Sequence, residues 1–547
     1  MTTFSLCSEP WIPARRPEGA IEELSLVEVF RQAHLIRDIV GEVPTQTFAL
    51  TRLLLAILHR SIEESDEPLQ YWRELWKADE LPAVLVEEYL DAFQERFDLL
   101  HPITPFFQVA DLHTQKGEVS GLERLIADVP NGQPFFTTRS QRGLARISFA
   151  EAARWIVHCQ AFDTSGIKSG AVGDDRVKGG KGYPIGTAWA GALGGILIEG
   201  VTLKQSLLLN LILATEDGRD TSGPDDLPAW ERDPLTPAVE DRAGAGPRGQ
   251  IDLFTWQSRR LRLAFDDDGV TGVLICNGDV VPQQNQHARE PMTSWRRSEP
   301  QEKALGLPLV YMPRTHDPER SMWRGLAALL PQCRRIDAQK TGAAALPALT
   351  LEWVGRLREG HAIEPGFVIR TRAIGMAYGS QSSTVAEIID DALSIHAVLV
   401  SEQGRELAAG AVDAVTATEE AVTAVAMLAG NLAVAAGGEA AGDRDRAREQ
   451  AYFLLDSPYR RWLSDLDEST DISVALHIWY DSVRRILWTL AQELIGAAGP
   501  TAWVGRENSL GRHVDTPQAD VWFRRALAKA LPTTRDTRPT ATPETEQ

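Results

Sequence analysis

The sequence changes character at about residue 402, and this change limits the folds that the chain can adopt. Before that point, short segments that alternate apolar and polar residues, such as 253–263, are mixed with helical segments. After it, strand patterns are absent, alanine is frequent and apolar residues recur at helical spacing. The clearest apolar stripe consists of Ile472, Leu476, Trp479, Val483, Ile486, Leu490 and Leu494. We therefore predict an α+β fold, with a mixed domain over residues 1–400 and a four-helix bundle over residues 401–531.

Four helices are expected in the C-terminal bundle. The first ends at a glycine-rich linker at 437–442, and the second covers about 444–466 with a kink at Pro458. The third carries the stripe described above. The fourth begins with Thr516 as its N-cap and Pro517 at its first position. Residues 532–547 have almost no apolar side chains, so we expect this tail to be disordered.

The N-terminal region offers three local predictions. Trp11-Ile12-Pro13 is expected to form an edge strand, because proline cannot donate a hydrogen bond inside a sheet. Ser25 is expected to cap a helix together with Glu28, in the pattern of a capping box. The strongly apolar segment 47–60 is expected to be a core helix.

Charge argues against a free-standing nucleic-acid-binding protein. The 547-residue chain has 56 basic and 76 acidic residues, a net charge of −20, whereas binding to phosphates requires positive charge. Local basic surfaces remain compatible with this composition. Pairs such as Arg259-Arg260, Arg296-Arg297 and Arg484-Arg485 occur, and most of these pairs are expected on solvated faces.

Several functional classes lack support in the sequence. The four cysteines are scattered without a CxxC pair, which predicts reduced thiols, no zinc ribbon and a cytoplasmic protein. No signal peptide is apparent, and no apolar run approaches the roughly 18 residues of a membrane span. Neither HExxH nor G-x-S-x-G occurs. We therefore expect no catalytic site, no metal, no cofactor and no membrane contact.

The segment 166–186 combines many glycines with three lysines and one arginine. Glycine allows a backbone to come close to another molecule, and lysine supplies charge for phosphate. A loop against a nucleic-acid groove and a plain surface hairpin are both compatible with this composition. A nucleotide-binding P-loop is excluded, because Asp175 stands where the first glycine is required and Gly182 where serine or threonine is required.

A second irregular segment, 131–147, contains the paired residues Phe135 and Phe136 together with Arg139 and Arg142. Aromatic rings and arginines are suited to stacking on bases and to contacts with phosphate. An equally good interpretation is a loop that is anchored in the core by one of the two phenylalanines.

Five segments occur in an order that resembles one family. They are SEPWIPARRPEGAIEELSLVEVF, LTRLLLAILHR, HPITPFFQV, FTWQSRRLRL and the helical C-terminal region. The chain resembles the CasA large subunit of type I-E CRISPR Cascade complexes. The resemblance implies a non-enzymatic subunit that recognises the PAM in double-stranded target DNA, helps to start R-loop formation and helps to recruit the helicase-nuclease. The implied partners are the other Cascade protein subunits, the CRISPR guide RNA, target DNA and the helicase-nuclease.

The resemblance also assigns residues to functions. It implies a glycine-rich loop, a finger in which arginine replaces lysine, and a glutamine wedge at Gln381, all approaching the PAM from the minor groove. The DNA-binding residues assigned in this way are Gly179, Gly180, Lys181, Gly182, Arg296, Arg297, Ser380 and Gln381. A loop that touches the guide RNA corresponds to Phe135, Phe136, Arg139 and Arg142.

Two alternatives differ in class from this interpretation. The chain could be a protein-interaction scaffold whose bundle binds other subunits while its loops touch no DNA. It could also be a hydrolase with an acid–histidine site in the α+β domain. A basic strip that joins Lys181, Arg296 and Gln381 would favour the DNA-binding subunit.

Overall fold

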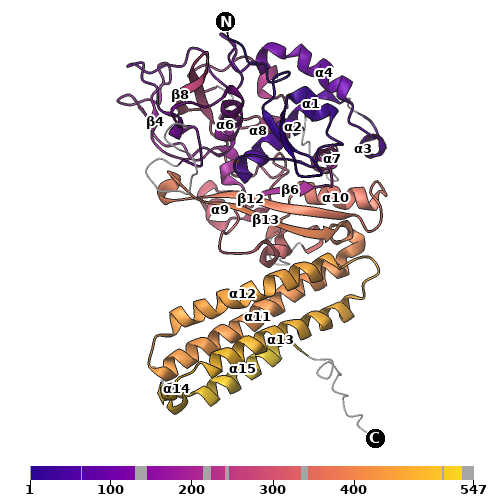
Figure 1. The fold of residues 1–547 in the computed structure, drawn as a ribbon, viewed down its shortest axis with the longest axis vertical. Coiled ribbons are helices and arrows are strands. Elements are labelled where there is room, and N and C mark those ends of the chain that lie inside the picture. The colour runs from indigo at the N-terminus through magenta and orange to yellow at the C-terminus, as the bar shows by residue number, and fades with distance from the viewer. Residues whose placement is uncertain are drawn as a thin grey trace. The chain divides into compact units, whose positions relative to one another are not determined.

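The computed structural model describes residues 2–62, 65–129, 144–213, 223–240, 246–333, 343–507 and 511–532. The chain folds into two compact units, each assembled from separate stretches of sequence (Figure 1). Unit 1 contains residues 1–320, 334–364 and 369–392, and unit 2 contains 321–333, 365–368 and 393–547. Helices and sheets are mixed, and the C-terminal region is helical, so the predicted α+β class is confirmed. The predicted boundary at residue 400, between two domains that would fold independently, stays a prediction.

Unit 1 begins with a small antiparallel sheet in the order β2-β1-β3, formed by β1 (Ile12–Arg15), β2 (Ile21–Leu24) and β3 (Asp38–Ile39). The expectation of an edge strand was wrong, because β1 lies between the other two. Pro13 is tolerated there as an acceptor, since its carbonyl receives a hydrogen bond from the Val40 N–H. The predicted capping box is confirmed, with Ser25 and Glu28 bonded reciprocally at the start of α1 (Leu26–Arg31).

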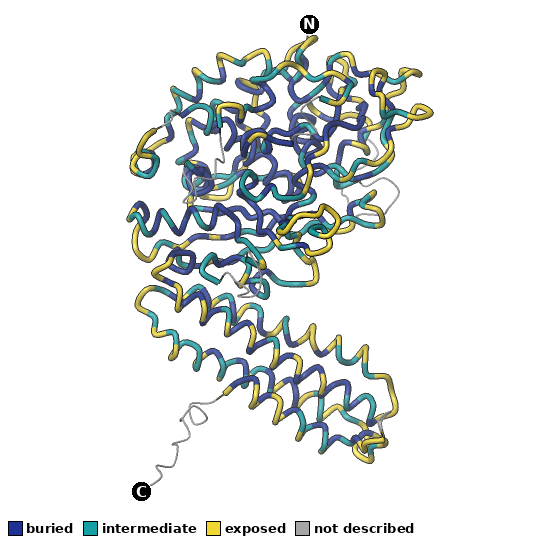
Figure 2. Tube along the Cα trace, turned by 180° about the vertical axis from the view of Figure 1, so that it is seen from behind, coloured by how far each residue is buried: buried dark blue, intermediate teal, exposed yellow. Residues whose placement is uncertain are grey.

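The core of unit 1 lies around α2 (Pro44–Ser61), which includes the predicted core helix and is buried along most of its length. Buried residues gather in the interior of this unit, in dark blue (Figure 2). It packs against α6 (Phe149–Phe162). At its centre, the buried Arg52 guanidinium makes two hydrogen bonds of 2.8 Å to Glu290. The further helices of unit 1 include α3 (Pro68–Lys77), α4 (Ala83–Ala92), α7 (Leu203–Asn210), α8 (Gln250–Phe254), α9 (Glu299–Leu305) and α10 (Leu349–Glu359).

A four-stranded sheet in the order β5-β4-β8-β7 carries the glycine-rich segment. Its strands are β4 (Lys168–Ser169), β5 (Lys181–Gly182), β7 (Arg259–Asp266) and β8 (Gly269–Asn277). Strands β7 and β8 form an antiparallel hairpin, and only the second half of the alternating segment 253–263 is strand, because α8 ends at Phe254 and β7 begins at Arg259. Arg259 and Arg260 are 1% and 0% exposed. This pair is an exception to the expectation that most arginine pairs lie on solvated faces, since both side chains form ion pairs in the interior.

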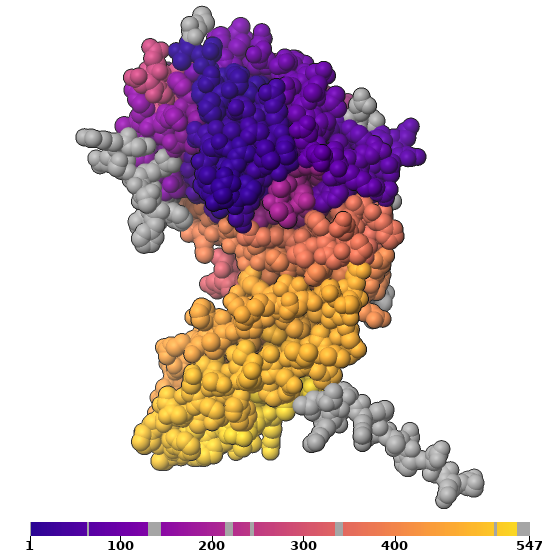
Figure 3. Space-filling view, turned by 45° about the vertical axis from the view of Figure 1, so that its right-hand side comes forward, coloured from indigo at the N-terminus to yellow at the C-terminus, as the bar shows by residue number. Residues whose placement is uncertain are grey.

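Two more sheets lie wholly or mostly in unit 1. One has the order β13-β12-β6, with β6 (Gly195–Glu199), β12 (Val368–Tyr378) and β13 (Val385–His396). The other has the order β10-β9-β11, with β9 (Trp295–Arg297), β10 (Tyr311–Pro313) and β11 (Ala345–Leu346). Residues Ala397–Val400, directly after β13, form a 3-10 helix. In the space-filling view, N-terminal residues in indigo lie beside later segments of unit 1 (Figure 3).

In unit 2, α11 (Arg405–Ala436), α12 (Ala440–Ser464), α13 (Ile472–Gly496) and α15 (Thr516–Ala530) lie side by side (Figure 1). The short α14 (Pro500–Val504), β14 (Arg506–Glu507) and β15 (His513–Val514) precede α15. The N-cap of α15 is Asp515, not the predicted Thr516, because the Asp515 carboxylate accepts from the Gln518 N–H. Pro458 lies within α12.

The helix α11 and the residues before it, Glu402–Ala436, are long and apolar enough to cross a membrane. The sequence analysis predicted no segment of membrane-spanning length, and it therefore overlooked this helix. In the bundle, 56% of its most apolar window is buried against the neighbouring helices. Burial of this kind is what a central helix of a bundle requires.

Candidate nucleic-acid interface

The glycine-rich segment ends in a tight hairpin whose four turn residues are Lys178, Gly179, Gly180 and Lys181. The N–H of Lys178 donates to the carbonyl of Lys181 over 3.0 Å, and the reverse bond measures 3.2 Å. Gly179 and Gly180 have φ angles of +60° and +74°. Two successive positive φ angles are typical of the primed turns that match strand twist, and glycine adopts them without steric cost. The surface hairpin weighed in the sequence is therefore present, and its glycines have a conformational reason.

The glycines of this segment fall into two classes. Gly179 and Gly180 are exposed, and a Cβ atom on either would meet nothing within 4 Å. Gly182 is buried, and its Cβ would lie 2.9 Å from Nδ2 of Asn277. Gly170 supports the hairpin, since a Cβ there would lie 2.7 Å from the Gly180 carbonyl carbon. At the tip of the hairpin, Gly179 and Gly180 therefore present bare backbone to solvent, whereas Gly182 is required by packing.

Charge at the hairpin comes from its lysines. Arg176 is bound internally, because its guanidinium pairs with Asp174 over 2.9 Å and donates to the carbonyls of Gly278 and Asn277. Lys178 and Lys181 are exposed, and no ion pair of either joins it to another residue in the described parts of the chain. The two lysines flank the bare backbone of Gly179 and Gly180, an arrangement suited to a polyanion.

Gln381 lies at the turn that joins β12 to β13. It is exposed and has a left-handed backbone with φ +54°, and Ser382 follows with φ +53°. Such angles are uncommon for residues other than glycine and persist only where the surroundings hold them. Besides hydrogen bonds within the turn, two contacts tie it to another segment: the Tyr378 hydroxyl donates to the Phe162 carbonyl over 2.7 Å, and the Ser165 N–H donates to the Ser382 carbonyl over 2.7 Å.

The two arginines of the candidate finger have different surroundings. Arg297 makes a 2.6 Å ion pair with Glu302 of α9. Arg296 is exposed, and its backbone pairs with Met312 of β10 and Ala345 of β11. The backbone of Arg296 is therefore held between two strands while its side chain reaches solvent. The side chain of Arg297 is instead bound to Glu302.

The stretch Asp163–Ser169 anchors both hairpins. Ser165 holds the turn of Gln381, while Lys168 and Ser169 pair with Gly182 and Lys181 of β5. Four residues of extended chain span roughly 14 Å at most, so the two anchor points lie within that distance. The structure thus brings together Lys181 and Gln381, which are 200 positions apart in the sequence, by way of a stretch whose anchoring role the sequence did not indicate.

Strand β6 relates Arg296 to the same region. Gly195 of β6 pairs antiparallel with Ile374 of β12 and, in an isolated bridge, with Thr293. The segments that contain Ile374 and Thr293 therefore run in the same direction, toward the edge of the sheet where β6 begins. Gln381 follows Ile374 and Arg296 follows Thr293 in the chain, so both residues lie toward that edge.

A buried charge cluster fixes the anchoring stretch. The Asp163 carboxylate pairs with Arg259 and, over 2.6 Å, with Lys168. Burial alone would raise the pKa of Asp163, but the two cations more than offset it and keep the pKa below its usual range. The sequence offered no signal for this pairing, because Asp163 and Arg259 lie far apart in the chain and become partners only in the fold.

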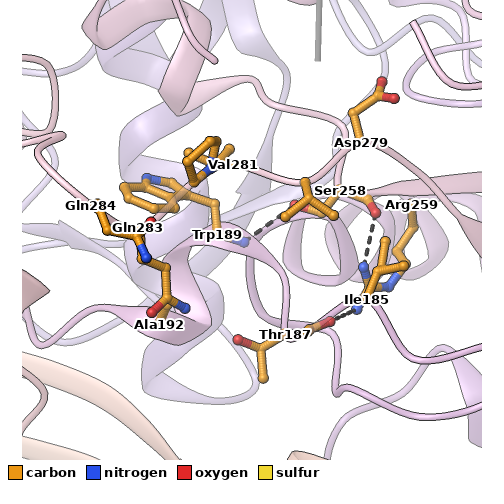
Figure 4. Close-up of a pocket in the computed structure, with 13 residues that line it drawn as sticks. Ile185, Thr187, Trp189, Ala192, Ser258, Arg259, Asp279, Val281, Gln283 and Gln284 are labelled. Atoms are coloured by element: carbon orange, nitrogen blue, oxygen red, sulfur yellow. Dashed lines mark hydrogen bonds between the residues drawn. The ribbon is translucent and has the colours of Figure 1, made fainter. Parts of the chain in front are cut away.

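A pocket of about 250 Å³ lies beside this cluster (Figure 4). Trp189 and Val281 form an apolar part of its wall. The Ser258 hydroxyl accepts a 3.2 Å hydrogen bond from the Trp189 backbone N–H. Arg259 reaches the Gly186 carbonyl with a 2.8 Å hydrogen bond at the rim. The pocket therefore borders the residues that follow the glycine hairpin.

Other sequence-based candidates have different outcomes. Phe135, Phe136, Arg139 and Arg142 lie outside the described residues. In the described parts of the chain, no group of three or more His, Cys, Asp or Glu could hold a metal. His316, which could have contributed to an acid–histidine site, is half-buried and forms a 2.9 Å hydrogen bond with the Gly195 carbonyl.

The fold and the comparisons place the chain in the class of large subunits of type I CRISPR surveillance complexes. It belongs to the family of CRISPR-associated protein Cse1, whose model matches residues 5–490. The predicted resemblance to CasA is thereby confirmed. A curated CasA/Cse1 protein of Thermus thermophilus is 27% identical over 94% of this chain and 99% of its own length.

Solved structures agree with this assignment. Cse1 of Thermobifida fusca is 48% identical, with a TM-score of 0.88 over 97% of this chain and 98% of its own. Cse1 of Acidimicrobium ferrooxidans is 30% identical, with a TM-score of 0.81 over 97% and 98%. A chain of a structure titled CRISPR RNA-guided surveillance complex shares the fold at 18% identity, with a TM-score of 0.62 over 97% of this chain and 100% of its own.

Proposed function

We propose that this Cse1 protein recognises the PAM in double-stranded target DNA and helps the guide RNA to start pairing. One observation carries the proposal: the glycine hairpin and the turn of Gln381 are anchored within a single stretch, Asp163–Ser169. Bare backbone at Gly179 and Gly180 can enter a narrow minor groove, which distinguishes A·T from G·C pairs. A side chain held rigidly beside it can separate the adjacent bases, at a cost of a few kcal/mol.

The remaining parts of the proposal concern partners. In the assembled complex, other Cascade subunits, the guide RNA and a helicase-nuclease bind to this protein, which performs no catalysis itself and acts in the cytoplasm. Unit 2 exposes Phe453, Val474 and Ile478, which are 82%, 55% and 59% accessible. Apolar side chains that stand in solvent support a role of the bundle in binding protein subunits.

The test of the proposed function replaces Gln381 in the complex assembled with its guide RNA. Gln381→Ala should slow R-loop formation on fully paired linear DNA much more than it weakens initial binding to the PAM, because nucleation of strand exchange is the difficult step. A target with mismatches at the PAM-proximal pairs is already open and should largely rescue the variant. R-loop formation is followed by strand-specific chemical footprinting.

The matched control is Gln70→Ala, a glutamine on the exposed side of α3. It should leave the rate of R-loop formation unchanged. Equal rates for Gln381→Ala and the unaltered protein on paired DNA would contradict the proposed wedge. A pre-opened target that gives no rescue would contradict it as well.

A further inference from the structure

A second pocket, of about 420 Å³, lies directly beside the glycine hairpin. One wall contains Gly179, Gly180 and Lys181 of the hairpin with Lys168 of β4, and the other contains residues of the loop 114–124. Four cationic side chains and one carboxylate line this pocket; they are Lys116, Arg124, Lys168, Lys181 and Glu118. In a chain with a net charge of −20, this is a local excess of positive charge.

The two walls are fixed to the same edge of β8. One edge of β8 is occupied by β7, and the other pairs with β4 at Cys276 and with Ser120 at Val273. These attachment points are three residues apart on β8, which is roughly 10 Å along a strand. A direct bond also joins the walls, since the Val172 N–H donates to the His113 carbonyl over 3.0 Å. The pocket is therefore part of the framework that holds the hairpin.

The loop that carries Lys116 is itself closed. The Gly117 N–H donates to the Thr114 carbonyl and the Glu118 N–H donates to the Thr114 hydroxyl, each over 3.1 Å. Gly117 has a φ of +67°, as such a turn requires. Lys116 therefore projects from a defined turn on the wall opposite the hairpin.

The lining cations differ in how far they are neutralised. Lys168 is balanced by Asp163 at 2.6 Å, with both side chains at most 10% exposed. Lys116 lies 3.7 Å from Glu118, but both side chains are more than two-thirds exposed, so their attraction is weak. Lys181 has no ion-pair partner in the described parts of the chain. Lys116 and Lys181 thus remain able to bind an anion from two walls.

We propose that this pocket binds a backbone phosphate of the duplex whose minor groove receives the glycine hairpin. The inference rests on the proposed function, because it places the DNA strand against the exposed face of Gly179 and Gly180. Lys181 and Lys116 approach the phosphate from the two walls, and Glu118 opposes them. Such a contact carries no sequence information, and it fixes the register of the hairpin on the duplex.

The test measures equilibrium binding of the assembled complex to duplexes with and without a PAM, over a series of salt concentrations. Lys116→Ala should weaken binding of both duplexes equally, by up to about fivefold. It should also lower the slope of log K against log salt by about 0.9, the value for one phosphate. Lys116→Arg should restore the slope, and Glu118→Gln should strengthen binding of both duplexes.

The matched control is Lys77→Ala, on α3, which lies on the other side of unit 1 from β4 (Figure 1). Lys77 is exposed like Lys116 and should leave the slope unchanged. An unchanged slope for Lys116→Ala, or an equal change for Lys77→Ala, would overturn the phosphate site. Loss of guide RNA from the Lys116→Ala complex, with an unaltered DNA slope, would assign the phosphate to RNA and also overturn the proposal.

Gly180→Val separates this inference from the proposed function. A β-branched side chain is strained at φ +74° and blocks close approach of the backbone, so discrimination of the PAM should fall. If Gly180→Val removes PAM discrimination while Lys116→Ala leaves the slope unchanged, the proposed function holds and the phosphate site is wrong. If discrimination survives in Gly180→Val while Lys116→Ala lowers the slope, the phosphate site holds and the proposed recognition is wrong.

Discussion

At the scale of single residues, neighbours with the same chemistry have different roles because their contacts differ. Arg296 extends into solvent, whereas Arg297 is held by Glu302 over 2.6 Å. We expect Arg296→Ala to lower affinity for a PAM-containing duplex by about tenfold, the effect of losing one base-edge contact. Arg297→Ala should lower the melting temperature of the subunit and change the affinity little. Binding titrations and thermal unfolding of both variants measure this difference, and a reversed pattern would make Arg297 the finger.

At the scale of elements, the bundle depends on an aromatic cluster at the centre of unit 2. Trp479 of α13 is 1% exposed, its ring lies 5.2 Å from that of Tyr459, and its indole N–H donates to the Thr418 hydroxyl over 3.0 Å. Trp479→Ala should destabilise the bundle by roughly 3–5 kcal/mol. In the full chain, hydrogen exchange should then accelerate by about two to four orders of magnitude at the slowest amides of α11 and α13.

The neighbouring residue supplies the control for this variant. Ile478 is 59% exposed on the same helix, so Ile478→Ala should leave amide exchange within about twofold of the unaltered protein. Equal exchange in both variants would mean that the Trp479 site does not contribute to bundle stability. Segment 321–333 belongs to the same unit, where the Trp323 ring stacks on Tyr459 at 4.5 Å. A fragment of residues 401–531 lacks this ring and should be less stable than unit 2 in the full chain.

At the scale of the whole molecule, charge determines what the chain can do alone. The net charge of −20 opposes binding to DNA. Many arginines also form ion pairs with carboxylates of the chain, as Arg259, Arg372 and Arg524 do. We expect the isolated chain to bind duplex DNA weakly, with affinity falling steeply between about 50 and 200 mM salt. Filter binding over this range checks the expectation. Cleavage of DNA by the pure chain with added divalent metal would contradict the proposed non-enzymatic role.

The sequence by itself determined features that depend on neighbours along the chain. The capping box of Ser25 and Glu28 and the helix around 47–60 follow from local hydrogen bonding and from apolar spacing. The stripe through Trp479 likewise specified a helix with one buried face. The glycines at 179 and 180 indicated a turn, since few other residues adopt two positive φ angles in succession.

The tertiary structure alone decided which side chains remain available. Arg259-Arg260 and Arg296-Arg297 are both arginine pairs in the sequence, yet the first pair is buried and Arg296 is exposed. Pro13 lies in a central strand because a strand that follows later in the chain pairs with its second edge. Lys181 and Gln381 are joined through Ser165 and Ser169, which carry no motif. Burial, ion pairing and anchoring of this kind arise from contacts between distant segments, so a local pattern in the sequence cannot specify them.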